Sequence, residues 1–528
     1  MIFKHEQDVR LRHDRHLRIA SAATGESEEK VVRKFLDQRV LLTGDDRRLR
    51  TQTGQLILSV AANLIARFCP KIDLIVPKDL SGYATVTQNI LQAVDKSSSA
   101  DFRVVNEPDF GIYAAVLSVG RPATMTHSTT IVDGKGWLAI VNQSGNLQAV
   151  PDQIDENPFG GLLAAALGAA EVFKYLLKPL PGKAHHFGDV TFSAFDYSIN
   201  TLAPGPPLPK NLVLPKSLLA GVGAVGNAFL LSLSYVEGLR GELIVVDEEF
   251  LDDPSNLNRY LLAFEEDIDP LNPKPKTQLA IQLFHGRPIE IQTFQGPLDQ
   301  ALQQIYDRQI ARPQVILSAV DNNEARRSLQ KVWPDLVLEG ATGGTTSQVS
   351  RHEYKKGLAC LLCIHTIEAD QGGFSYTKHV AHLSGLAEER IAASHRDGSL
   401  AVTEQDVAKA PEEKKSLLRE NLGKPICSVL SELENISSAN PNVLPVQPAV
   451  SFVSMISGLL MAGELVKSSS GIESALETMF QMDALFPLSS ALVQPIEKGK
   501  QCYCLMRRNE IDQYRLAMQN KSLGAHLN

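Results

Sequence analysis

A glycine-rich turn is the part of this chain best suited to chemistry. It reads Gly221-Val222-Gly223-Ala224-Val225-Gly226-Asn227 and lies between the apolar runs 218–220 and 228–239. The first glycine permits a tight turn, the second lets backbone approach phosphate oxygens, and the third lets a helix pack close to a strand. Because a helix N-terminus also favours anionic charge, the turn predicts a nucleotide site.

Polar residues farther along the chain distinguish between two nucleotides. Asp247 ends the next apolar strand, where a carboxylate accepts hydrogen bonds from the ribose of either NAD or ATP. Amide and cationic donors suited to triphosphate oxygens follow, namely Asn256, Asn258, Arg259 and Lys276. Asp321-Asn322 follows another strand, from which a carboxylate can hold Mg²⁺ between phosphates. The set favours ATP, because hydride transfer requires neither phosphate-facing cations nor a metal-binding acid.

Four of the six cysteines form two closely spaced pairs. Cys360-x-x-Cys363 and Cys502-x-Cys504 can each place two sulfurs on one side of a turn. Four thiolates suit a closed tetrahedral zinc site. The expected role is structural, because such a site would pin the C-terminal segment to the sheet.

The two remaining cysteines lie in different surroundings. Cys69 ends an apolar helix and is interpreted as a core thiol. Cys427 lies in a polar stretch and is the unpaired cysteine of the second half. Because Lys424 is nearby and its charge favours the thiolate, Cys427 is the candidate nucleophile.

Composition limits the class of protein. The 528 residues suffice for two or more domains, and 44% hydrophobic with 21% charged residues is typical of a globular protein. A net charge of −8 argues against nucleic acid as a partner. The charged start, 1–18, argues against a secretory leader, and the apolar stretches near Leu162 and Phe452 carry Gly, Ser and Glu at helical spacing, as buried helices do. We expect a cytoplasmic protein without a membrane partner.

The elements that must position these residues are arranged in two halves, joined by the Pro-rich stretch 203–209. In the second half, apolar runs at 218–220, 243–247 and 315–320 are separated by helical stretches. Continuous apolar strands of this kind indicate a parallel sheet covered on both faces.

The first half looks like a degraded copy of the second. A short strand at 40–42 is followed by Gly44 alone, and Pro77 stands where Asp247 ends the corresponding strand. The later helices 158–174 and 451–467 align without gaps. Since the first half has no full glycine turn, we expect one nucleotide site.

The motifs of the second half resemble those of the ThiF/MoeB/ubiquitin-activating superfamily, over most of residues 215–510. Members of that superfamily adenylate the C-terminal glycine of a ubiquitin-like or sulfur-carrier protein. The resemblance implies that Asp247 binds ribose and that Asp321 holds Mg²⁺. It also implies phosphate contacts for three residues, Asn258, Arg259 and Lys276. The sequence departs from the family at Tyr260, where glutamine is common.

The first half is similar to the inactive adenylation half of ubiquitin-activating enzymes. In that family an arginine near the start of one half reaches the active site of the other, and Arg15 in the segment 12–18 stands at the matching position. The resemblance also implies that Cys427 receives the activated carrier as a thioester. The chain ends too soon for the C-terminal ubiquitin-fold domain of dedicated enzymes, which favours a compact bacterial form.

We therefore expect an α/β fold with two pseudo-duplicated, Rossmann-like ThiF-type adenylation domains and an inserted helical region that carries the catalytic cysteine. The expected boundaries are 1–200 for the inactive domain, 210–370 with 445–510 for the active domain, and 371–444 for the insertion.

The expected function is ATP- and Mg²⁺-dependent adenylation of a ubiquitin-like protein, followed by thioester formation and transfer to a conjugating enzyme. A sulfur-carrier adenylyltransferase is the first alternative, although such chains usually have a single adenylation half. A second alternative is an NAD-dependent oxidoreductase, which Lys276 and Asp321 disfavour. A third is a non-enzymatic scaffold, which is disfavoured because the second half keeps its nucleotide motifs. We expect a monomer that is itself a pseudo-dimer, or a homodimer.

Overall fold

The computed structural model describes residues 16–17, 19–21, 24, 26, 28–97, 99–146, 157–178, 184–354, 357–366, 381, 384–396, 400–424, 426, 429 and 450–520. The chain forms two units. The larger contains Met1–Ile364 with Pro448–Asn528, and the smaller is His365–Gln447.

The first half of the larger unit contains a seven-stranded sheet in the order β3-β2-β1-β4-β5-β6-β7. Strands β1 to β5 are parallel, and β6 and β7 run antiparallel to their neighbours. The strands are β1 (Arg39–Gly44), β2 (Lys71–Leu74), β3 (Asp101–Val104), β4 (Tyr113–Val119), β5 (Thr129–Lys135), β6 (Leu138–Asn142) and β7 (Val190–Ser193).

The second half repeats this topology in an eight-stranded sheet of order β12-β9-β8-β13-β14-β15-β16-β17. Again the first five strands in this order are parallel and the rest antiparallel. The shared order confirms the predicted pair of Rossmann-like folds. The strands are β8 (Ser217–Ala220), β9 (Gly241–Asp247), β12 (Ile289–Gln295), β13 (Val315–Ser318), β14 (Leu336–Gly343), β15 (Thr346–Glu353), β16 (Met479–Asp483) and β17 (Leu492–Gln494), with a separate ribbon of β10 (Phe250–Leu251) and β11 (Lys274–Pro275).

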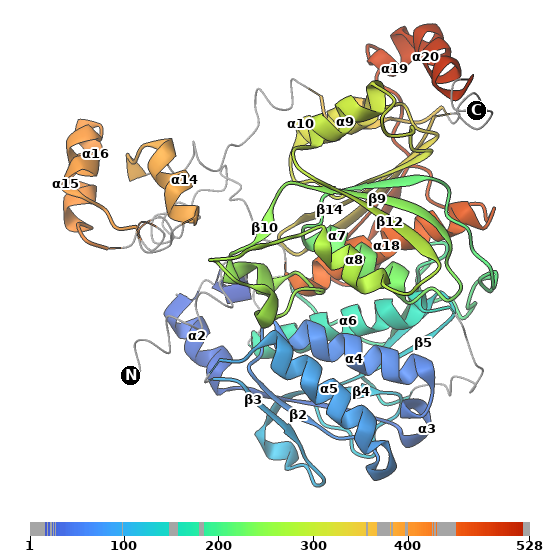
Figure 1. Cartoon of the computed structure of the whole chain (residues 1–528). Coiled ribbons are helices and arrows are strands. Elements are labelled where there is room, and N and C mark those ends of the chain that lie inside the picture. The colour runs from blue at the N-terminus through green and yellow to red at the C-terminus, as the bar shows by residue number, and fades with distance from the viewer. Residues whose placement is uncertain are drawn as a thin grey trace. The chain divides into compact units, whose positions relative to one another are not determined.

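Four apolar helices lie between the two sheets and form the centre of the core (Figure 1). They are α4 (Gln52–Ala66), α6 (Phe159–Leu176), α7 (Ala224–Ser234) and α18 (Ser451–Ser469). Helix α6 is long and apolar enough to cross a membrane by composition, yet all of it is buried inside the protein, as a core helix would be.

The other helices of the larger unit lie around this centre, with α9 and α10 on the opposite face of the second sheet (Figure 1). They are α2 (Glu28–Asp37), α3 (Asp46–Leu49), α5 (Ser81–Val94), α8 (Gln278–Phe284), α9 (Leu298–Tyr306), α10 (Asn323–Gln330), α11 (Leu361–Ile364), α19 (Tyr503–Met506) and α20 (Arg508–Asn520). Single 3₁₀ turns are η1 (Lys78–Leu80), η2 (Phe110–Ile112), η3 (Pro254–Asn258), η4 (Glu265–Asp267) and η5 (Leu488–Ser490).

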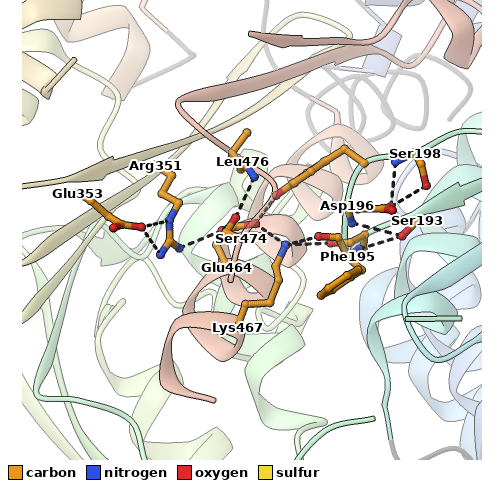
Figure 2. A network of polar contacts seen from close by, with 12 residues as sticks. Ser193, Phe195, Asp196, Ser198, Arg351, Glu353, Glu464, Lys467, Ser474 and Leu476 are labelled. Carbon is orange, nitrogen blue, oxygen red and sulfur yellow. Dashed lines mark hydrogen bonds and ion pairs between the residues drawn. The ribbon is translucent and has the colours of Figure 1, made fainter. Parts of the chain in front are cut away.

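Helices α6 and α18 carry the same buried ion pair at the same place. Lys174 lies 2.5 Å from Glu171 with both side chains fully buried, and Lys467 pairs in the same way with Glu464. A buried charge is tolerated only when it is paired, so an identical pair three residues apart in both helices is specific evidence of duplication. Figure 2 shows that Glu464 also reaches Arg351.

The smaller unit has its own core. Its helices are α14 (Glu388–Arg396), α15 (Glu404–Lys409) and α16 (Glu412–Glu420). Thr403 caps α15 in a capping box with Asp406, whose carboxylate also accepts a 2.9 Å hydrogen bond from Arg390. Ile426 and Val429 are buried in the core of this unit.

Candidate functional site

The glycine turn joins β8 to α7, and a different physical reason requires or favours glycine at each of its three glycine positions. Gly221 has φ +91°, and a Cβ there would lie 2.7 Å from the carbonyl oxygen of Ala319. A Cβ on Gly226 would lie 2.1 Å from the carbonyl oxygen of Gly221, so the helix can pack here only with glycine. Gly223 caps α7 and has open space around it, the nearest atom being the hydroxyl of Tyr260 at 4.0 Å. A ligand can therefore approach the backbone at Gly223.

Asp247 ends β9 beside this turn. Its Oδ2 accepts a 2.6 Å hydrogen bond from the N–H of Val222, and its Oδ1 accepts a 2.8 Å bond from the N–H of Glu249. Burial raises the pKa of Asp247, although these two backbone donors oppose the effect. The carboxylate thus fixes the turn relative to β9. It lies at the carboxyl end of β9, which is the strand that follows the turn and α7 in the chain.

The site lies where the strand order of the sheet reverses. Strand β8 has β9 on one side and β13 on the other, so the connections from β8 and β13 leave in opposite directions. Open α/β sheets bind ligands at this point, outside the carboxyl ends of their strands. Asp321 and Asn322 follow β13 and are exposed, and Asn322 caps α10 by accepting a 2.8 Å bond from the N–H of Ala325.

Arg326 holds the loop that carries Asp321. It donates a 3.1 Å hydrogen bond to the carbonyl of Val320 and lies 2.8 Å from the buried carboxylate of Glu339 on β14. Glu339 in turn accepts a bond of 3.2 Å from Ser350. The expected magnesium ligand is therefore placed at the surface by a buried polar network.

The predicted phosphate donors lie on η3 and the irregular segment after it. Asn256 and Asn258 are buried, and Asn258 donates a 2.9 Å hydrogen bond to the carbonyl of Ser255. Among the residues that the structure describes, the Nε of Arg259 is buried without a hydrogen-bond partner. A buried donor without an acceptor is costly, and an anionic ligand oxygen would satisfy it.

Lys276 is buried and its ammonium faces two groups that sequence reasoning missed. It pairs with the carboxylate of Glu249 and donates a 2.8 Å hydrogen bond to the hydroxyl of Tyr260. Although burial alone would lower it, these neighbours hold the pKa of Lys276 above its ordinary value, so the side chain is charged. The hydroxyl of Tyr260 thus lies next to both the ammonium of Lys276 and the backbone of Gly223, and no local sequence pattern identifies this position.

Asn227 contacts the backbone of the glycine turn. Its side chain is fully buried and donates to the carbonyls of Val222 and Gly223 at 2.6 and 3.0 Å. Its oxygen accepts a 3.1 Å bond from the N–H of Leu262. Through these backbone contacts Asn227 holds the turn against the segment after η3.

The corresponding crevice of the first half is filled by a side chain. Gly44 ends β1, and the loop continues into α3. Arg48 of α3 is buried, pairs with Asp133 on β5 and donates a 3.2 Å bond to the carbonyl of Gly134. Its Cγ would lie 2.7 Å from a Cβ on Gly120, which follows β4. An internal ion pair thus lies at the position in the first half that corresponds to the glycine turn of the second half.

The four paired cysteines come together at the start of α11 and of α19. Their Sγ atoms all lie within 4.8 Å of one another, and three of the Sγ–Sγ distances are 3.7, 3.8 and 3.7 Å. Tetrahedral coordination with metal–sulfur bonds of about 2.3 Å requires sulfurs about 3.8 Å apart. The cluster therefore has the dimensions of a Cys₄ metal site, in which Cys360, Cys363, Cys502 and Cys504 would be the ligands.

Two predicted residues, Arg15 and Cys427, lie outside the residues that the structure describes. His16, next to Arg15, is described and buried, and its Nδ1 lies 3.4 Å from the Oδ1 of Asn258. Cys69 is buried, and burial raises the pKa of its thiol to about 12. Cys69 is thus an unreactive core thiol, as expected.

The fold and the glycine turn at the reversal of strand order define a Rossmann-like nucleotide-binding protein. Residues 200–504 match the family model for the ThiF family. This match covers more than half of the chain, and the chain belongs to the ThiF family.

The chain is also similar to one curated protein and to solved structures. An uncharacterized protein of Sinorhizobium fredii, y4jF, is 25% identical over 490 residues, which are 89% of this chain and 89% of that protein. Among solved structures, MccB of E. coli with AMPCPP and SeMet MccA is 12% identical, covers 56% of this chain and 67% of its own, and has a TM-score of 0.34. The same protein with ATP is 13% identical over the same shares, with a TM-score of 0.32. Membership in the ThiF family supports ATP-dependent adenylation of a substrate C-terminus, and thus an adenylate-forming enzyme.

Proposed function

We propose that this chain activates a ubiquitin-like protein in two steps at one nucleotide site. In the first, a carboxylate oxygen of the carrier's C-terminus attacks the α-phosphorus of ATP, and pyrophosphate leaves with the former α–β bridging oxygen. In the second, the thiolate of Cys427 attacks the acyl carbon, AMP leaves, and a thioester remains. Transfer of the acyl group to the thiol of a conjugating enzyme would follow.

The observation that carries this proposal is the buried Nε of Arg259, which has no partner among the described residues. It belongs to the segment beside the glycine turn, whose Gly223 leaves room for a phosphate. Lys276 adds a second buried cation. Asp247 ends β9 and Asp321 follows β13, and these two strands pair with β8 on its two sides. Donors fixed around developing phosphate charge are the main requirement of such a reaction.

The residues present fit the groups that adenylation requires. Asn258, Arg259 and Lys276 would contact phosphates, and Asp247 would contact ribose. Asp321 would hold Mg²⁺, which neutralises charge on the phosphates. Asn256 and Asn322 would support these contacts, with Gly221, Gly223 and Gly226 shaping the turn. Arg15 would add a cation from the first half.

The four-cysteine cluster supports a structural zinc ion. Its sulfur spacing suits tetrahedral thiolate ligation, and a site with four protein ligands has no position open for catalysis. The ion would tie α19 and the C-terminal helix α20 to the segment before α11. This role separates the ion from the chemistry at Gly223.

The proposal that Cys427 is the nucleophile rests on the sequence, in which the positive charge of Lys424 lies nearby. Ile426 and Val429 are buried in the core of that unit, and Ile426 donates a 2.8 Å backbone hydrogen bond to Leu400. Residues on both sides of Cys427 are thus anchored. The region 371–444 would act as the carrier of the cysteine.

Pyrophosphate exchange with a panel of ubiquitin-like and sulfur-carrier proteins tests the first step. Exchange that depends on one carrier and is lost in Arg259→Ala would support the site. If no carrier supports exchange while the protein binds NAD tightly, the proposed activity is wrong. A non-reducing gel tests the second step, since a thiol-labile adduct should disappear in Cys427→Ala and persist in Cys69→Ala. An adduct that survives Cys427→Ala would assign the nucleophile elsewhere, and adenylation without any adduct would favour a sulfur-carrier enzyme.

A further inference from the structure

The phosphate-contacting segment, defined as Leu257–Ala263, has little regular structure of its own. Helix η3 ends at Asn258, and the chain then turns without forming a strand or a longer helix. This segment nevertheless contains Asn258, Arg259 and Tyr260. Backbone carbonyls in a buried irregular segment must find donors outside it.

The end of helix α4, in the first half, supplies those donors. Arg67 donates a 2.6 Å hydrogen bond to the carbonyl of Leu257 and a 3.3 Å bond to that of Ala263. Asn63 donates a 3.1 Å bond to the carbonyl of Leu261. The three carbonyls include both ends of the phosphate-contacting segment, so α4 holds the segment along its whole length.

Asn63 and Arg67 also fix each other. The Oδ1 of Asn63 accepts hydrogen bonds of 3.0 and 2.8 Å from the Nε and Nη2 of Arg67. The two residues lie one helical turn apart, on the same face of the helix, so their side chains can support each other. Arg67 is 1% exposed, and burial lowers the pKa of its guanidinium to about 9, which leaves it charged at neutral pH.

Further contacts from the first half surround the same region. The N–H of Lys96 donates a 2.5 Å hydrogen bond to Glu265, and its ammonium lies 3.7 Å from Glu266. His16 lies beside Asn258, as described above. The second half contributes Asn227, which accepts from the N–H of Leu262. Much of the support for this region thus comes from the half that has no nucleotide motif.

We propose that Asn63 and Arg67 are positioning residues of the adenylation site, and that the first half serves as a clamp on the phosphate-contacting segment. The inference rests on the proposed function, because it assigns Arg259 and Asn258 to the triphosphate. Catalysis at the phosphates of ATP depends on holding hydrogen-bond donors close to the productive geometry, and small displacements of these donors lower the rate strongly. Arg67 would not contact the phosphates itself. It positions Asn258 and Arg259 by holding the backbone of the segment that contains them.

The test compares Arg67→Met with a matched control, Arg48→Met. Both arginines are buried in the first half, but the partners of Arg48 lie within that half. Carrier-dependent pyrophosphate exchange would be measured against ATP concentration and normalised to folded protein. Arg67→Met should lower kcat/KM about 10- to 100-fold, with a raised KM for ATP, because displaced donors bind phosphate poorly. Arg48→Met should lower the melting temperature and leave the KM unchanged.

A conservative variant separates charge from geometry. Arg67→Lys keeps a positive charge, but one ammonium on a flexible stem lacks the rigid fork that joins two carbonyls. It should raise the KM for ATP as Arg67→Met does. A wild-type KM in both variants, per folded molecule, would overturn the proposal.

Hydrogen exchange provides a readout that does not depend on activity. Amides of Leu257–Ala263 should exchange faster in Arg67→Met than in Arg48→Met. Equal exchange in the two variants would overturn the clamp. If the wild-type chain shows no pyrophosphate exchange with any carrier, the proposed function fails, and hydrogen exchange still decides whether the clamp exists.

Discussion

Glu464→Gln tests the central ion-pair network between the two halves. Glu464 is completely buried and accepts a 2.7 Å hydrogen bond from Tyr197. It also accepts hydrogen bonds of 3.0 Å from Arg351 and 2.6 Å from Ser474 (Figure 2). Lys467 pairs with it and donates a 2.8 Å bond to the carbonyl of Phe195. Glutamine keeps the size of the side chain and can still accept from a hydroxyl, so the substitution removes mainly the charge.

The magnitude follows from what remains after the charge is lost. Lys467 would be a buried cation without its carboxylate, and Arg351 would keep only its ion pair with Glu353, at 2.7 Å. Removing one partner of a buried ion pair costs about 3–5 kcal/mol. We expect Glu464→Gln to lie within this range, because Lys467 loses its carboxylate while Arg351, which cannot lose its proton, keeps only Glu353.

Glu171→Gln is the matched control, since Glu171 has the same place in α6. Its carboxylate faces Lys174 and, at 2.5 Å, the half-buried His186. A histidine can lose its proton, so the loss of Glu171 leaves one obligatory buried cation and should cost about 3 kcal/mol. Free energies of unfolding would come from urea denaturation monitored by circular dichroism. A cost for Glu464→Gln below about 1 kcal/mol, or no greater than that for Glu171→Gln, would refute the reasoning.

Three further predictions concern the turn, the cysteine cluster and acid stability. Gly226→Ala should abolish ATP binding measured by calorimetry, because the added Cβ would lie 2.1 Å from the carbonyl oxygen of Gly221. Chelation should release about one zinc ion per chain, detected with a zinc dye, and expose α20 (Arg508–Asn520) to protease. Burial raises the pKa of Glu464, but Lys467 and Arg351 outweigh this effect and lower the pKa below its ordinary value. The stabilisation from ionised Glu464 is therefore complete above the unfolded pKa near 4.3, and it is lost as the pH falls through the folded pKa. Glu464→Gln should therefore flatten the acid limb of a stability–pH curve.

Local patterns predicted most of the fold. The apolar runs at 218–220, 243–247 and 315–320 correspond to strands β8, β9 and β13, and the gap-free alignment of 158–174 with 451–467 corresponds to helices α6 and α18. These predictions succeeded because a buried strand or helix shows its period within a short window. Helix α7 begins at Ala224, inside the glycine motif and earlier than the predicted 228. Its first turn is fixed by packing against Gly221, which periodicity does not reveal.

The residues that support the site could not be predicted in the same way. Arg67 contacts Leu257, 190 residues away in the chain, and its sequence surroundings indicate only a cation at the end of an apolar helix. Tyr260 looked like a departure from the family pattern, yet its hydroxyl accepts from Lys276. Asn227 was predicted as part of the nucleotide-binding turn, and its contact with the N–H of Leu262 was not foreseen. Roles of this kind depend on which distant segment a side chain meets, and one sequence does not contain that information.

The two halves use the same skeleton but balance charge differently at the point where the strand order reverses. In the first half Arg48 meets the internal carboxylate of Asp133, so the crevice is neutral and closed. The Nε atoms of Arg48 and Arg259 are both buried without a partner among the described residues, but in the second half no described carboxylate pairs with Arg259, so a phosphate would complete its hydrogen bonding. In the first half the carboxylate of Asp133 thus pairs with Arg48, and in the second half the phosphate of a bound nucleotide would pair with Arg259 instead. Asp133→Asn should therefore destabilise the first half without creating a second ATP site, because Arg48 itself still fills the space beside Gly120. Calorimetry that found two ATP sites in this variant would contradict the steric part of the argument.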